Sequence, residues 1–150
     1  MHWHCYSWVG VGDELWREAE RRPVPGTGRP PGTAHPLPEP DPALFSRSHL
    51  PPMRTGDWLL KPRSRISLTG DEVGQVLAWL RAQYAHAEGS FLRPDQEARI
   101  GVEYRLEEAA GLLARGVDVQ WGIWLQGGRY LCLGVVCCPH AQLPHPCPAR

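Results

Sequence analysis

A proline-dense stretch in the first half of the chain limits what the sequence can fold into. Residues 23–52 contain ten prolines. Proline lacks a backbone N–H and holds the preceding residue in an extended conformation, so long helices and internal strands are excluded here. We expect no regular structure in this stretch beyond at most one turn near residues 43–45. Residues 22–55 are therefore predicted to be a Pro/Gly-rich linker, or a strap lying over a domain.

The chain of 150 residues is long enough for one domain and too short for two, so residues 1–150 are expected to form a single domain. Hydrophobic residues make up 42% of the sequence and include seven tryptophans, which is sufficient for a hydrophobic core.

The only lysine is Lys61, against fifteen arginines, and asparagine is absent. Because Lys and Asn have AT-rich codons, this bias indicates a high-GC genome, such as that of an actinobacterium.

Net charge and hydrophobic run length exclude some classes of partner. Sixteen basic and sixteen acidic residues cancel, so the chain lacks the positive charge on which nucleic-acid binding depends. No run of apolar residues is long enough to span a membrane. The first residues lack the pattern of a secretory leader, and five cysteines are an odd number. We therefore expect a cytoplasmic protein with reduced thiols and without nucleic-acid or membrane partners.

Several segments have the composition of strands. The first nine residues are rich in aromatic and β-favouring side chains, and residues 56–68 resume an extended pattern. Residues 117–126 and 129–138 flank Gly127-Gly128, which is typical of a two-residue hairpin turn.

The two-residue turn sets the expected register of this hairpin and places Trp121 opposite Gly134. One face, expected to pack on helices, then consists of Val117, Val119, Trp121, Ile123, Leu125, Tyr130, Cys132, Val136 and Cys138. The other carries Asp118, Gln120, Trp124, Arg129, Leu131, Leu133, Val135 and Cys137. This second face is too apolar for simple solvent exposure, so either a further layer covers it or it is a binding surface.

Helical periodicity is present between these strands. A helix is expected from about Gly70, after capping-box spacing at residues 69–72, and a second from residue 94 or 95 to residue 114. A short helix is expected at residues 13–22. The apolar stripe of the first of these helices consists of Val73, Val76, Leu77, Leu80 and Tyr84. The predicted fold is α+β: a small antiparallel sheet of about four or five strands with two helices packed on one face, interrupted by the long Pro-rich insert.

Histidines and cysteines near the two chain ends suggest a metal site. His2 and His4 leave the same face of a strand, about 7 Å apart at their Cα atoms. Residue types that suit zinc lie near the other end of the chain, namely Cys137, Cys138, His140, His145 and Cys147.

If the first strand pairs beside the last, His2 and His4 meet Cys137 and His140. The same pairing would let either histidine activate Cys137 as a nucleophile. The spacing matches no established zinc motif, so we expect no cofactor and a flexible Pro-rich tail at residues 139–150. A bound zinc ion is the alternative.

A second candidate site uses the aromatic face of the first strand. If that face continues into the half-polar face of the hairpin, it forms an aromatic-lined concavity that suits a small molecule or a protein partner. A second hydrophobic core is the competing interpretation. The predicted ligand-binding residues are His2, His4, Tyr6, Asp118, Gln120 and Trp124.

No motif fixes a reaction, so three functions remain open. The first is a small binding or protein-interaction module that uses the Trp-rich sheet face, with a small molecule, another protein or a second copy of itself as partner. The alternative is a small enzyme of specialised metabolism with a pocket on the non-helical face. The third is a zinc-stabilised domain.

Overall fold

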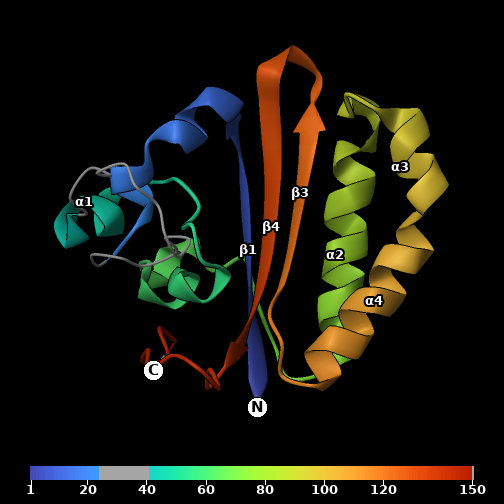
Figure 1. Cartoon of the computed structure of the whole chain (residues 1–150). Helices are drawn as coiled ribbons and strands as arrows, with labels where there is room; N and C mark the ends of the chain where they lie inside the picture. The colour runs from blue at the N-terminus through green and yellow to red at the C-terminus, as the bar shows by residue number, and fades with distance from the viewer. Residues whose placement is uncertain (24–40, 150) are drawn as a thin grey trace, which may run out of the picture.

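The computed structural model describes residues 1–23 and 41–149 and contains an antiparallel four-stranded sheet. The longer helices cover one face of this sheet, and short helical segments joined by loops cover the other (Figure 1). The spatial order of the strands is β2-β1-β4-β3. Their bounds are β1 His2–Val11, β2 Leu68–Gly70, β3 Val119–Leu125 and β4 Arg129–Cys138. The predicted α+β fold is confirmed.

The helical face is formed by α2 (Val73–Ala87), α3 (Pro94–Ile100) and α4 (Val102–Ala114). The predicted stripe of α2 is confirmed, with its central residues fully buried. This helix starts at Val73 rather than Gly70, because Gly70 is in β2. The single helix predicted for residues 94–114 is two helices, since Gly101 has a φ of +82° and ends the first. None of the described helices is long and apolar enough to cross a membrane.

The register of the β3–β4 hairpin differs from the prediction by one residue. Leu125 pairs with Arg129, so the loop has three residues, Gln126–Gly128, and Trp121 lies opposite Leu133 rather than Gly134. Both loop glycines have positive φ, at +74° and +70°. Because strand side chains alternate, this one-residue shift turns every β4 side chain to the opposite face. The prediction was right for the face of β3 and wrong for the face of β4.

The helical face therefore buries the leucine-rich side of β4. Trp3 and Cys5 of β1 lie on the same side and pack with β3, α2 and α4 into the larger of two hydrophobic cores. The β4 residues in this core are Leu131, Leu133, Val135 and Cys137.

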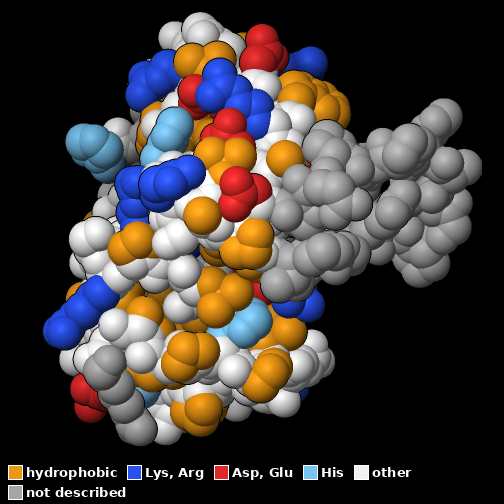
Figure 2. Space-filling model, turned by 90° about the vertical axis from the view of Figure 1, so that its left-hand side faces the viewer, with side chains coloured by type: hydrophobic (Ala, Val, Ile, Leu, Met, Phe, Trp, Pro, Cys, Tyr) orange, Lys and Arg blue, Asp and Glu red, His pale blue; other side chains and the backbone are white. Residues whose placement is uncertain are grey.

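A second layer covers the other face of the sheet, as one of the two sequence interpretations expected. Its core joins Tyr6 and Trp8 of β1 to Trp58 and to Cys132 and Val136 of β4. The elements of this layer are η1 Gly12–Trp16, η2 Glu18–Arg21, α1 Pro42–Arg47, η3 Thr55–Leu60 and η4 Arg63–Arg65. Seen from outside, hydrophobic side chains are interspersed with basic and acidic ones over its described part (Figure 2).

Three local predictions in this layer were wrong. The helix expected at residues 13–22 is two short 3₁₀ segments, and the extended structure expected at residues 56–68 is mainly 3₁₀ turns. The six-residue helix α1 exceeds the single turn predicted near residues 43–45. The part of the strap prediction that concerns residues 24–40 lies outside the described residues.

Trp58 explains why Gly134 is needed at its position. A Cβ at Gly134 would lie 2.8 Å from the indole Nε1 of Trp58, which is too close for any other side chain. Tyr6 lies opposite Gly134 in the ladder and stacks on the same indole, with ring centroids 4.8 Å apart. Gly134 thus makes room for Trp58 of the second layer, and it does not lie opposite Trp121 as predicted.

Candidate metal centre

The pairing of β1 with β4 brings three potential metal ligands together. His2 lies directly opposite Cys138, and His4 lies opposite Val136. Side chains at directly opposed positions have Cβ atoms about 5 Å apart, and residues two apart on one strand share a face. His2, His4 and Cys138 therefore leave the same end of the same sheet face.

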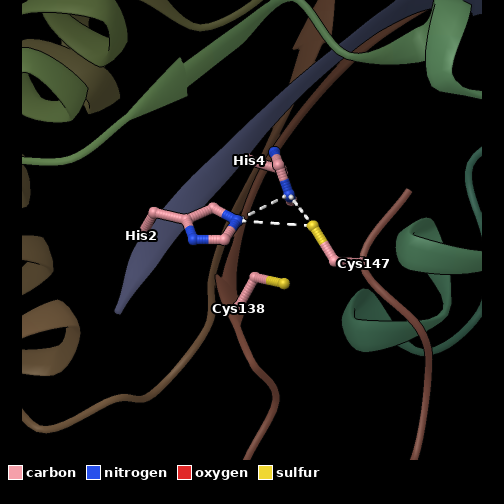
Figure 3. Close-up of side chains that lie close together, drawn as sticks. All are labelled: His2, His4, Cys138 and Cys147. Carbon is pink, nitrogen blue, oxygen red and sulfur yellow. Dashed lines mark hydrogen bonds between the residues drawn. The ribbon is translucent and has the colours of Figure 1, made fainter. Parts of the chain in front are cut away.

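The fourth potential ligand comes from the C-terminal segment, which contains no helix or strand. Residues 139–149 run from the end of β4 along the lower edge of the second layer, at the end of the sheet where β1 begins (Figure 1). Cys147 Sγ lies 3.5 Å from Nε2 of His2 and 3.5 Å from Nε2 of His4. Figure 3 shows all four side chains directed at a common point. The donor atoms of His2, His4, Cys138 and Cys147 all lie within 4.8 Å of one another.

These distances approach the edges of a tetrahedral zinc site. A zinc ion with two nitrogens at ~2.0 Å and two sulfurs at ~2.3 Å holds its donor atoms about 3.3 to 3.8 Å apart. The Nε2 atoms of His2 and His4 are 3.2 Å apart, and the two sulfur–nitrogen distances of Cys147 are 3.5 Å. Two thiolates and two neutral imidazoles also balance the charge of a divalent ion. Three of the four donor atoms thus have the spacing of a Cys₂His₂ zinc centre, and Cys138, within 4.8 Å of them, would complete its ligand set.

The surroundings of His4 favour the neutral imidazole, with the lone pair of Nε2 directed into the cluster. Its Nδ1 is 2.9 Å from the hydroxyl of Thr69, its cross-strand neighbour on β2. If Nδ1–H donates to this hydroxyl, Nε2 carries the lone pair that points into the cluster. Burial, and secondarily the proximity of His2, lowers the pKa of His4. The neutral form is therefore favoured, and only a neutral imidazole binds a metal.

Two histidine–carboxylate contacts attach the segment that carries Cys147. Nε2 of His140 lies 2.9 Å from Oδ2 of Asp118, whose Oδ1 accepts a hydrogen bond from the backbone N–H of Cys137. Nε2 of His145 lies 2.9 Å from Oδ1 of Asp57 in η3. Asp57 is fully buried and also accepts hydrogen bonds from the Arg54 guanidinium. The C-terminal segment thus connects the sheet to the second layer.

The structure brings together half of the predicted metal ligands. His2 and His4 converge as expected, but Cys137 is in the helical core and His140 binds Asp118. Cys138 takes the place of Cys137 because the β4 register is shifted by one residue. Cys137 is also on the wrong face for activation by either histidine, and burial raises its pKa to about 11.

The predicted ligand-binding residues do not line one cavity. His2 and His4 belong to the cluster, Tyr6 is buried beneath Trp58, and Asp118 holds His140. Gln120 accepts a hydrogen bond from Thr55. Trp124 is 47% exposed and packs on Tyr130, at the far end of the sheet.

A cleft of about 290 Å³ lies beside the C-terminal segment and shares only Asp118 with the predicted set. Its histidine is His140, whose Nδ1 accepts hydrogen bonds from the backbone N–H groups of Gln142 and Leu143. Because Nε2 faces Asp118, both ring nitrogens are occupied. His140 therefore shapes the C-terminal segment and is not poised as a base.

The structure reveals polar residues that sequence reasoning missed. Nothing in the pattern around Asp57 distinguishes it from a surface carboxylate, and its partner His145 is 88 positions away. By contrast, Cys147 was visible as a potential ligand, and only its position in space was unknown. Comparisons with family models, with curated proteins and with solved structures find no match to this chain.

Proposed function

We propose that this chain is a zinc-binding domain in which a Cys₂His₂ centre fastens the C-terminal segment to the sheet. The observation that carries the proposal is the convergence of His2, His4, Cys138 and Cys147, whose donor atoms all lie within 4.8 Å of one another. Four protein ligands leave no open coordination position, which is the hallmark of a structural rather than a catalytic zinc site.

The role of the metal follows from what its ligands connect. Three ligands are on neighbouring strands, and the fourth is on a segment that also binds Asp57 of η3 through His145. A bound metal ion would therefore link the sheet to the C-terminal segment, which is itself joined to the second layer. Because the complete ligand set exists only in the folded chain, the free energy of metal binding stabilises the fold.

Neighbouring cysteines provide a matched test of this proposal. Cys138→Ser should abolish zinc binding, whereas Cys137→Ser should retain it, since the two side chains lie on opposite faces of β4. A second pair uses histidines, with His2→Gln losing zinc and His86→Gln retaining it, since His86 is an exposed residue of α2. Zinc content is measured by atomic emission on protein purified without an affinity tag of histidines.

Chelation tests the structural role independently. When free zinc exceeds its Kd about a thousandfold, binding contributes about 4 kcal/mol, so a chelator should markedly lower the Tm of the wild type. The Tm of Cys138→Ser should not respond to the chelator. A purified wild-type chain without metal, or equal zinc content in Cys137→Ser and Cys138→Ser, would contradict the proposal.

The interaction-module hypothesis rests on fewer residues than the sequence indicates, because Tyr6 and Trp8 are buried. The aromatic residues that support it are Trp124 and the 79% exposed Trp16. Both lie away from the metal centre, so Trp124→Ala would weaken binding of a partner without changing zinc content.

A further inference from the structure

The five cysteines occupy two kinds of environment. Cys5, Cys132 and Cys137 are buried away from the cluster. All three are packed into the hydrophobic cores, with exposures of 2% or less. Thiols buried in apolar surroundings are poor nucleophiles, because burial disfavours the thiolate. These three cysteines are therefore expected to be inert towards mild oxidants.

Cys138 and Cys147 differ from these three because their sulfurs face each other. The two Sγ atoms lie within 4.8 Å, and in a metal centre both would be thiolates. Cys147 is half-buried, whereas Cys138 is only 1% exposed. An oxidant arriving from solvent therefore meets Cys147 first, with a second sulfur directly behind it. Closing the gap breaks no backbone ladder, because Cys147 is outside any helix or strand.

We propose that Cys147 and Cys138 form a peroxide-sensitive pair, in which oxidation to a disulfide releases the metal. This inference rests on the metal centre proposed above. The Cys147 thiolate attacks one peroxide oxygen, the O–O bond breaks, and a sulfenic acid and hydroxide form. The Cys138 thiolate then attacks the Cys147 sulfur, the S–O bond breaks, and a second hydroxide leaves. Each sulfur loses one electron, the peroxide gains two, and both hydroxides take protons to become water.

Oxidation would exchange one attachment of the C-terminal segment for another. The disulfide removes both thiolates from the coordination sphere, and His2 and His4 alone are too few to retain a structural zinc ion. The covalent bond still links residue 147 to the end of β4. The oxidised chain is therefore expected to lose its metal while its C-terminal segment remains attached to the sheet.

The experiment treats zinc-loaded wild-type protein with hydrogen peroxide and follows zinc release with a chromogenic chelator. The protein is then denatured, alkylated, reduced and alkylated again with an isotopically heavy reagent. We expect release of one zinc ion per chain, and heavy label on Cys138 and Cys147 but not on Cys5, Cys132 or Cys137. Reduction with added zinc should restore the metal content. Cys137→Ser should behave like the wild type.

Two results would overturn the inference. One is retention of zinc while Cys138 and Cys147 still accept the first reagent. The other is added oxygen on Cys147 without protection of Cys138, which would show that the second sulfur does not resolve the sulfenic acid. Zinc content before peroxide is added tests the metal centre separately, so failure of the metal proposal is distinguishable from failure of the redox proposal.

Discussion

The two faces of the sheet are covered in different ways. On one face, α2 and α4 provide their own backbone hydrogen bonds and need only bury an apolar stripe. On the other face, helical segments of six residues or fewer leave many backbone groups without a regular partner. Buried polar side chains supply those partners. A layer without long helices therefore relies on specific polar contacts, and here on the proposed metal.

Lys61 illustrates this dependence. It is 3% exposed, and its ammonium group donates hydrogen bonds to the carbonyls of Phe45 and Ser48 at the end of α1. Arg21 makes similar contacts with the carbonyls of Leu15 and Pro51. On the helical face, by contrast, Arg81 and Glu103 form an exposed ion pair outside the core.

The largest loss of stability is expected from a substitution in the hydrophobic core beneath the helices. Leu80→Ala removes a fully buried side chain of α2 and should lower the free energy of unfolding by about 2–5 kcal/mol. Urea denaturation measures this loss, and Leu92→Ala is the control, since Leu92 is largely exposed. A loss for Leu80→Ala no greater than that of the control would show that apolar packing does not dominate this face.

A smaller effect is expected from the polar contacts of the second layer. Lys61→Met keeps the bulk of the side chain but leaves the carbonyls of Phe45 and Ser48 without their donor, which should cost about 1–3 kcal/mol. Urea denaturation at pH 7 provides the measurement. An unchanged or higher stability would mean that burying the ammonium group costs as much as its hydrogen bonds contribute.

The same substitution has a predicted pH dependence. Burial, and to a lesser extent the positive charge of Arg65, lowers the pKa of Lys61 from 10.5 to about 8. Between these values the unfolded chain binds more protons at Lys61 than the folded chain, so the wild type gains stability relative to Lys61→Met as pH rises. The stability difference should grow by roughly 1 kcal/mol between pH 8 and pH 9. A constant difference across this range would contradict the lowered pKa.

The smallest effect is expected from the exposed ion pair of the helical face. Arg81→Ala removes the partner of Glu103, and both groups are fully solvated. Solvent screening makes such pairs weak. The Tm should equal that of the wild type within error, and a clear decrease would show that polar contacts matter on this face too.

The buried face of β3 was predictable from the sequence, whereas the register of the β3–β4 hairpin was not. Alternation of apolar residues from Val119 to Leu125 identified the buried face of β3 correctly. The dipeptide Gly127-Gly128 indicated a hairpin but not whether Gln126 belongs to its loop. That uncertainty of one residue decided which side of β4 faces the helices. The greater bulk of Leu131 and Leu133, compared with Cys132 and Gly134, was a usable guide to the correct side.

The candidate site was predictable only in part, for the same reason. His2 and His4 share a face in any extended conformation, so their pairing needed no tertiary information. The hairpin register decides whether Cys137 or Cys138 faces these histidines. The path of the C-terminal segment, which has no secondary structure, decides whether His140 or Cys147 reaches them. The elements that build the second layer escaped prediction because 3₁₀ turns and buried polar contacts leave no periodic pattern.

X-ray absorption at the zinc edge of the purified wild-type protein tests the central claim most directly. It reports the identity and distance of the atoms around the metal without any substitution. The proposed centre predicts two nitrogen neighbours at ~2.0 Å and two sulfur neighbours at ~2.3 Å. Absence of zinc, or a shell of nitrogen and oxygen atoms without sulfur, would contradict a centre built from His2, His4, Cys138 and Cys147.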